Sequence, residues 1–207
     1  MNPSVNPVPS LGNPTAQDML TLDSLLRETV APHLHLANRE DLRILNLACG
    51  QCDEAGTLVN FGQAQTGGDV SLIGADIRIR EVLQARENHA QLPAEFLLED
   101  ATKLSLHKEL GEDFKLVLLR HQNYWNGPEL WKKIFEHGLS KTDEEGVLVI
   151  TSYFDKEHQL ALDTLQGLGA ELLVTRHNPQ ARKLLRPGKF VDKHIAVLRR
   201  KQHSRKA

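Results

Sequence analysis

The chain has 207 residues, of which 40% are hydrophobic and 25% are charged, and this is the composition of an ordinary soluble globular domain. A formal net charge of −2 gives no overall electrostatic reason to bind nucleic acid or a membrane surface. No apolar run is long enough to cross a bilayer, and the two cysteines cannot build a disulfide framework. The sequence therefore predicts a cytoplasmic enzyme or binding protein without a metal site.

The composition divides the chain into one domain and two tails. Residues 1–14 are rich in proline and asparagine and lack the basic start and apolar core of a signal peptide, which predicts a flexible N-terminal tail. Residues 15–200 carry the apolar periodicity of a single domain, and residues 201–207 form a basic C-terminal tail.

Apolar periodicity predicts alternating helices and strands along this domain. An amphipathic helix from Thr15 to Pro32 precedes a first strand, LRILNLA. Further strands are predicted at VSLIGAD, AEFLLEDA, FKLVLLRH and GVLVITSYF, separated by helices that begin near Asp53, Ile79, Gly127 and Asp155. The last two strands, AELLVTRH and KHIAVLRR, have no helix between them and are expected to be antiparallel neighbours.

This alternation predicts an α/β fold with a doubly wound, mostly parallel sheet. In such sheets ligands bind beyond the carboxyl ends of the strands. Small, polar or charged residues lie at four of these predicted ends: Ala48-Cys49-Gly50, Ala75-Asp76-Ile77, Glu99-Asp100-Ala101 and Arg120-His121. Their convergence is the main sequence evidence for one binding site.

The strand-end residues favour a nucleoside ligand without phosphates. Gly50 allows a tight turn and close backbone approach, but Asp53 and Glu54 in the next helical turn would repel a pyrophosphate. Asp76 is placed to accept both hydroxyl groups of a ribose, and Asp100 could accept a hydrogen bond from an adenine amino group. The ligand predicted in this way has a nucleoside and an amino-acid-like end.

These motifs together resemble those of class I S-adenosylmethionine-dependent methyltransferases. ILNLACGQCDEAGTL is similar to the family's first motif, LIGADI to its second, FLLEDATKL to its third, FKLVLLRH to its fourth, and EEGVLVITSYF to the strand that follows. The match runs in the right order from about residue 40 to residue 200. It implies a Rossmann-like methyltransferase fold with seven strands, the last inserted antiparallel beside the fifth.

The resemblance also implies roles for individual residues. The cofactor would be S-adenosyl-L-methionine, bound by Asn46, Ala48, Cys49, Gly50, Asp76, Ile77, Asp100, Ala101 and Arg120. His121 is the predicted general base, because neutral imidazole is poised near the operating pH, and Tyr124 is predicted to stack on the acceptor. Two departures from the family pattern bear on affinity: Cys52 replaces the usual second glycine, and Asn46 stands where aspartate is frequent.

The acceptor and two other functions stay open. Short segments around the expected site favour a small-molecule acceptor over a macromolecule, and the basic C-terminal tail is a weaker indication of RNA. A non-catalytic cofactor-binding protein on the same fold is one alternative. The other is a thiol oxidoreductase that uses Cys49 and Cys52, because a Cys-x-x-Cys pair between strand and helix is also the thioredoxin arrangement.

Overall fold

The computed structural model describes residues 14–37, 39–106, 110–111 and 113–201. Pro14 already begins a helix and Lys201 follows the last strand, so the remainder of both predicted tails lies outside the described residues. The strands are β1 (Leu42–Leu47), β2 (Val70–Asp76), β3 (Ala94–Leu98), β4 (Phe114–Arg120), β5 (Thr142–Ser152), β6 (Ala170–His177) and β7 (His194–Arg200). The helices are α1 (Pro14–Leu25), α2 (Ala55–Gln65), α3 (Ile79–Asn88), α4 (Pro128–Lys141) and α5 (Asp155–Gly167), with short helical turns η1 (Leu26–Val30), η2 (Ala31–His33), η3 (Ala101–Leu106) and η5 (Tyr124–Asn126).

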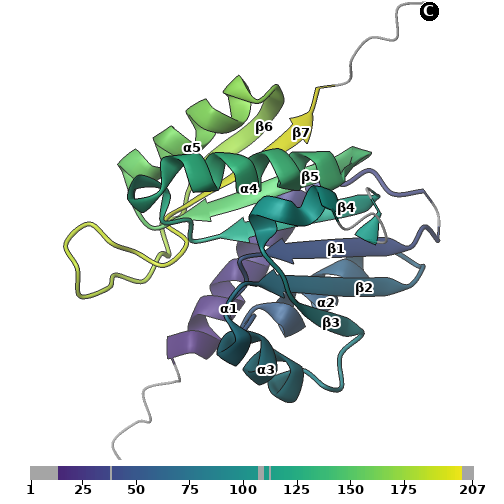
Figure 1. The fold of residues 1–207 in the computed structure, drawn as a ribbon. Helices are drawn as coiled ribbons and strands as arrows, with labels where there is room; N and C mark the ends of the chain where they lie inside the picture. Colours follow the sequence, from purple (N-terminus) through teal and green to yellow (C-terminus); the bar gives the residue numbers. More distant parts are fainter. Residues whose placement is uncertain (1–13, 38, 107–109, 112, 202–207) are drawn as a thin grey trace, which may run out of the picture.

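These strands form one seven-stranded sheet in the order β3-β2-β1-β4-β5-β7-β6 (Figure 1). The first five strands run parallel, and β7 is antiparallel to both of its neighbours, β5 and β6. The prediction of a doubly wound, mostly parallel sheet with an antiparallel last strand is confirmed.

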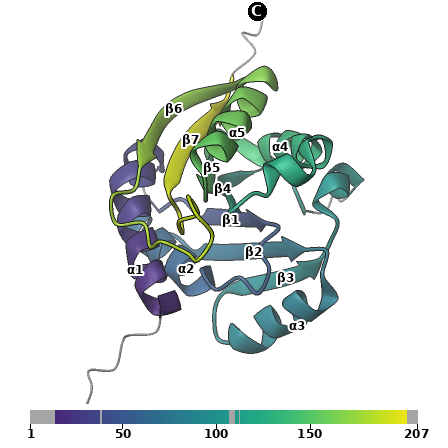
Figure 2. The same ribbon diagram turned by 90° about the vertical axis from the view of Figure 1, so that its left-hand side faces the viewer.

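Helices cover both faces of the sheet, so the central strands are buried on both sides. In β1, Leu42 and Ile44 belong to a core cluster with residues of α1, α2 and α3. The alternate residues Leu45 and Leu47 belong to a second cluster with residues of η3, α4 and α5. Figure 2 shows α1 and α2 on one side of the sheet and α4 and α5 on the other. Two-sided burial explains why these strands appear in the sequence as continuous apolar runs.

Two element boundaries differ from the prediction. The first helix reaches the expected end but changes geometry on the way, from α-helix in α1 to a π turn in η1 and a 3-10 turn at Ala31–His33. Helix α2 begins at Ala55 rather than Asp53, because Cys52 adopts a left-handed backbone with φ of 53° and its carbonyl accepts the amide of Ala55 at 2.8 Å. The extra turn lengthens the connection between β1 and α2.

The carboxyl ends of β1, β2 and β4 meet at one edge of the sheet. The arrowheads of β1 and β2 point to the side on which the long connection between β6 and β7 projects (Figure 1). That connection therefore overhangs the edge at which the sequence places a site. Among the helices of the described residues, none combines the length and apolar character that a bilayer crossing requires.

Candidate functional site

A left-handed turn follows β1. Ala48, Gly50 and Cys52 have φ of 54°, 59° and 53°, and the amide of Cys52 closes the turn on the carbonyl of Cys49 at 2.9 Å. Such backbone angles cost little only at glycine, so the two non-glycine residues hold them against a conformational penalty. The amide of Cys49 also donates to the carbonyl of Ala75 at 3.2 Å, which fastens the turn to the end of β2.

Asp76 ends β2 and faces this turn. Its Oδ2 accepts the amide of Gly50 at 2.8 Å, and its Oδ1 accepts the amide of Arg78 at 2.9 Å. Burial alone would raise the pKa of Asp76, but hydrogen bonds from Arg78 and Gly50 outweigh it and lower the pKa below its ordinary value. The structure thus holds an ionised carboxylate beside a glycine turn, at the place where the sequence predicts a ribose contact.

The side chain of Arg78 covers that carboxylate. Its Nε lies 2.9 Å from Asp76 Oδ1 and its Nη2 lies 3.2 Å from Asp76 Oδ2. A Cβ built on Gly50 would lie 3.1 Å from the same Nη2, so the guanidinium also fills the space over the turn. The side chain of Arg78 is 59% exposed. A long, largely exposed side chain can rotate out, whereas the two backbone amides stay with the carboxylate.

A buried amide and a buried carboxylate lie under the turn. Asn46 is inaccessible to solvent, and its Nδ2 donates to Glu54 Oε1 at 2.6 Å and to Cys52 Sγ at 3.2 Å. Its Oδ1 has no hydrogen-bond partner in the described part of the chain. Because an unpaired buried carbonyl oxygen is costly, this atom is a candidate acceptor for a ligand donor.

Arg120 joins β1, β4 and β7 through an ion cluster. It ends β4, and its Nη1 lies 3.2 Å from Glu54 Oε2 while its Nη2 lies 2.6 Å from Asp192 Oδ2. Thr151 Oγ1 donates to the other oxygen of Asp192 at 2.7 Å. Burial lowers the pKa of Arg120, but the charge of Asp192 and then Glu54 outweigh it and raise the pKa above its ordinary value. The carboxylates of Glu54 and Asp192 carry two negative charges and the guanidinium of Arg120 one positive charge, so the cluster has a net negative charge.

His121 lies next to this cluster, in a left-handed conformation with φ of 60°. Its Nε2 is 2.8 Å from Asp192 Oδ1, and its ring stacks on Tyr153 with a centroid separation of 3.9 Å. Burial lowers the pKa of His121 more than the neighbouring Asp192 raises it, so the imidazole is neutral near pH 7. The backbone amide of Asp192 also donates to Nε2 at 3.2 Å, so the carboxylate and the amide of Asp192 together orient the imidazole.

The structure gives Tyr124 a packing position. Its hydroxyl pairs with Thr164 of α5, and its ring stacks on Phe135 of α4 at 5.9 Å. The residue is only 8% exposed. These contacts pack the side chain against α4 and α5, and the predicted stacking of Tyr124 on an acceptor stays a prediction.

The residues predicted near the adenine lie at the same edge of the sheet. The amide of Glu99 donates to the carbonyl of Asp76 at 3.0 Å, which places the end of β3 beside the end of β2. Asp100 immediately precedes η3, and its Oδ1 accepts the amide and hydroxyl of Thr102 at 3.0 and 2.7 Å. Ile77 is 66% exposed and Ala101 is buried. Their contacts to adenine stay predictions.

Cys52 does not have the properties of a nucleophilic thiol. It is fully buried, and a hydrogen bond with Cys49, burial and the charge of Glu54 together raise the pKa of its thiol. An attacking thiol requires the opposite shift, so thiol chemistry at this pair would depend on Cys49. The sheet order also differs from the thioredoxin arrangement that the cysteine spacing indicated.

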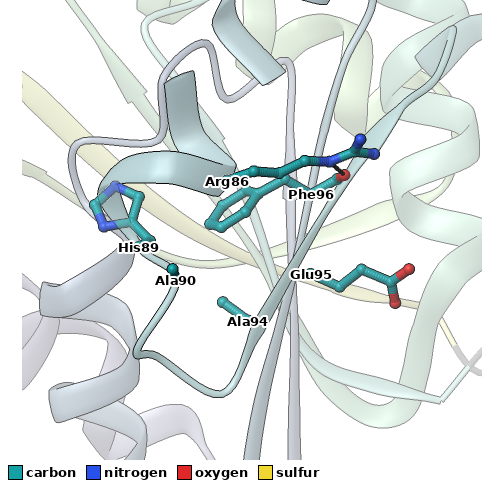
Figure 3. Close-up of a pocket in the computed structure, with 6 residues that line it drawn as sticks. All are labelled: Arg86, His89, Ala90, Ala94, Glu95 and Phe96. Carbon is teal, nitrogen blue, oxygen red and sulfur yellow. Dashed lines mark hydrogen bonds between the residues drawn. The ribbon is translucent and has the colours of Figure 1, made fainter. Parts of the chain in front are cut away.

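A cavity of about 240 Å³ lies away from this site, at the amino end of β3 (Figure 3). It is open to one side, and Arg86 closes part of it by donating to the carbonyl of Phe96 at 2.8 Å. Its lining residues come from α3 and β3: Arg86, His89, Ala90, Ala94, Glu95 and Phe96. None of them belongs to the strand ends described above.

Comparison with known proteins supports the fold. No protein-family model matches the chain, and no curated protein matches it. Among solved structures, an S-adenosylmethionine-dependent methyltransferase from Clostridium acetobutylicum matches with a TM-score of 0.65 at 10% identity, over 89% of this chain and 92% of that chain. Magnesium protoporphyrin IX methyltransferase from Synechocystis, solved with bound S-adenosylmethionine, matches with a TM-score of 0.63 at 17% identity, over 91% of this chain and 85% of that chain.

A third match is a TehB-like methyltransferase from Corynebacterium glutamicum, with a TM-score of 0.59 at 16% identity over 89% of this chain and 87% of that chain. The chain therefore has the fold of class I S-adenosylmethionine-dependent methyltransferases. At these identities the likeness establishes the fold, and the activity is argued from the site.

Proposed function

We propose that this protein transfers a methyl group from S-adenosyl-L-methionine to a small-molecule acceptor. The observation that carries the proposal is the contact between the Asp76 carboxylate and the Gly50 amide at 2.8 Å, because the acid that would bind the ribose and the glycine turn then lie together at one sheet edge. The fold places both at the carboxyl ends of adjacent strands, where ligands of doubly wound sheets bind.

The residues at this edge suit the cofactor. Asp76 would hold the ribose hydroxyls once Arg78 turns away, and the unpaired Oδ1 of Asn46 would accept a donor such as an ammonium group. Gly50, Ala48 and Cys49 would line the amino-acid end, while Ile77, Asp100 and Ala101 would lie near the adenine. The net negative cluster of Glu54, Arg120 and Asp192 favours a cationic ligand over a neutral one.

Bound there, the cofactor would supply an electrophilic sulfonium methyl group. The acceptor's lone pair would form a bond to the methyl carbon, and the electron pair of the broken carbon–sulfur bond would stay on sulfur. The protein's part is to orient the acceptor, exclude water and receive a proton. His121, neutral and oriented by Asp192, would take that proton from an acceptor O–H or N–H group.

Calorimetric titration of the purified full chain with S-adenosylmethionine and S-adenosylhomocysteine tests the proposal. We expect Asp76→Asn to weaken binding at least tenfold, because ribose hydroxyls lose a charged acceptor. Asp69→Asn is the matched control, since Asp69 precedes the same strand at its opposite end. Equal affinity of the two variants, or no binding by the parent protein, would refute the cofactor site. Binding without turnover on any acceptor would instead identify a non-catalytic cofactor-binding protein.

A further inference from the structure

The connection between β6 and β7 folds into a small basic hairpin, residues 181–191. Lys183 and Phe190 form an antiparallel bridge, and the amide of Leu184 donates to the carbonyl of Lys189 at 2.9 Å. Pro187 and Gly188 make the tip, where Gly188 has φ of 73° and the amide of Lys189 returns to the carbonyl of Arg186 at 3.1 Å. Proline then glycine with positive φ is the signature of a type II turn.

This hairpin is anchored across the carboxyl edge of the sheet. At one side Arg182 pairs with Asp18 of α1 at 2.6 Å. At the other side the amide of Phe190 donates to the carbonyl of Tyr153 at 3.2 Å, directly after β5. Asp192, the next residue but one, is held in the ion cluster by Arg120. The hairpin is thus built into the candidate site, and both views show it at the strand ends (Figures 1 and 2).

Three of the four cations on the hairpin make no ion pair with the described residues. Residues 181–191 contain Arg182, Lys183, Arg186 and Lys189 and no aspartate or glutamate. Arg182 is paired with Asp18, but Lys183, Arg186 and Lys189 make no ion pair with any of the described residues. Lys193, just beyond the hairpin, is already paired with Asp155 at 2.6 Å. These three cations, which lie close together at the sheet edge without an ion pair, would attract an anionic ligand.

Aromatic rings hold two of these cations beside the proposed base. Lys189 Nζ lies 4.0 Å from the centroid of Tyr153, the same ring on which His121 stacks. Arg186 Cζ lies 5.3 Å from the ring centroid of Phe154. The ring centroid of Trp125 lies 5.0 Å from that of Phe154. A cation over a ring keeps its N–H groups free for another acceptor.

The extent of positive charge favours a small anion over a polyanion. Nucleic acid binding requires a basic stripe along a face of the molecule. Here Lys183, Arg186 and Lys189 lie on one short hairpin, and the neighbouring amino-terminal turns of α4 and α5 carry Glu129, Asp155 and Glu157. The partly exposed rings of Trp125 and Phe154, inclined at 59° to each other, add apolar surface next to Arg186.

We propose that the basic hairpin and the rings of Tyr153, Phe154 and Trp125 form the acceptor subsite, and that the acceptor is a small aromatic anion. Its anionic group, a carboxylate or a phosphate, binds Arg186 and Lys189, and its ring lies against Trp125 and Phe154. This inference rests on the proposed methyl transfer. The rings follow β4 and β5, whereas Asp76, the proposed ribose acid, ends β2, so the two ligands would occupy different parts of the edge.

The experiment titrates the full chain, saturated with S-adenosylhomocysteine, and follows tryptophan fluorescence. The aromatic anions are 4-hydroxybenzoate and phenyl phosphate, the neutral match is methyl 4-hydroxybenzoate, and the polyanion is a single-stranded RNA oligonucleotide. We expect at least one aromatic anion to bind tenfold or more tighter than the neutral ester. The double variant Arg186→Gln, Lys189→Gln should remove that preference, and Arg186→Lys should retain part of it.

The matched control is the double variant Lys132→Gln, Lys133→Gln, which removes two exposed charges from α4. It should change anion binding less than twofold, and circular dichroism should show both double variants folded. Equal binding of ester and anions, no binding of either anion at millimolar concentration, or an unchanged hairpin variant would overturn the inference. So would RNA binding tighter than either anion. The affinity for S-adenosylhomocysteine, measured separately in each variant, should equal that of the parent protein. If the parent protein does not bind this cofactor product at all, the proposed function is refuted instead.

Discussion

Arg120 grips both carboxylate oxygens of Asp192, a residue 72 positions later in the chain, with Nε at 3.0 Å from Oδ1 and Nη2 at 2.6 Å from Oδ2. The pair connects the end of β4 to the segment just before β7, which begins at His194. Both side chains are nearly inaccessible to solvent, with exposures of 10% for Arg120 and 1% for Asp192. Asp192 also holds His121 and Thr151. One carboxylate thereby fixes the base, the ion cluster and the end of the basic hairpin.

Replacing Asp192 should therefore cost much more than a surface ion pair does. Asp192→Ala leaves a buried guanidinium with only Glu54 as its partner, and we expect the free energy of unfolding to fall by about 3 kcal/mol. Urea denaturation measures this change. The control is Asp23→Ala, which breaks the exposed pair with Arg27, and it should cost less than about 1 kcal/mol. Similar losses of unfolding free energy in both variants would mean that the buried cluster stabilises the fold no more than an exposed ion pair does.

Arg78 should compete with the cofactor for Asp76. Arg78→Gln removes a side chain that covers the carboxylate and carries the same sign of charge as a sulfonium. Because an exposed ion pair is worth at most about 1 kcal/mol, we expect S-adenosylmethionine to bind about two- to fivefold tighter in calorimetric titration. Arg80→Gln, on the exposed surface of α3 just after Arg78, is the control and should have no effect. Weaker binding by the Arg78 variant would show that its guanidinium contacts the ligand instead.

The two thiols should differ sharply in reactivity. Cys49 is partly exposed, whereas Cys52 is buried and the pKa of its thiol is raised by the hydrogen bond with Cys49 and by burial. We expect Ellman's reagent to label one thiol of the native protein, and Cys49→Ser to abolish that labelling until urea is added. Rapid labelling of both native thiols would contradict the burial of Cys52.

Much of the fold could be predicted because each central strand carries its own signal. Phe114–Leu119 is buried without interruption and is apolar except for Lys115, and strands covered on both faces appear in a sequence as nearly continuous apolar runs. The same reasoning placed Asp76 and Gly50 at one edge, and they are in contact. The position of β7 between β5 and β6 came from the resemblance, since antiparallel insertion leaves no local pattern.

The surroundings of the site could not be predicted in the same way. Asp192 reaches Arg120 only because the β6–β7 hairpin folds back over the strand ends, and no spacing in the sequence encodes that return. Glu54 was interpreted as a helix-terminal acid, but it is 4% exposed and bonded to Asn46 and Arg120. Arg78 could have been suspected from Asp-x-Arg at the end of a strand, since an arginine two residues on can reach back to the acid.

His158 should make the protein less stable in mild acid. It is buried between Ser152 and Thr175, and burial, together with the nearby His194, lowers its pKa to about 4. Its unfolded pKa is near 6.5, so between pH 6.5 and pH 4 the unfolded chain binds more protons than the folded one. The free energy of unfolding therefore falls as the pH is lowered through this window, while the contribution is complete above pH 6.5.

At pH 5.0 we expect a loss on the order of 2 kcal/mol from this residue alone, relative to pH 7.5. Urea denaturation at both pH values should show a smaller fall in His158→Gln than in the parent protein. The pKa values of His121 and His194 are also lowered by burial, but both residues remain in the variant, so the difference between the two proteins isolates His158. An equal fall in both would mean that His158 is protonated as readily in the folded state as in the unfolded chain.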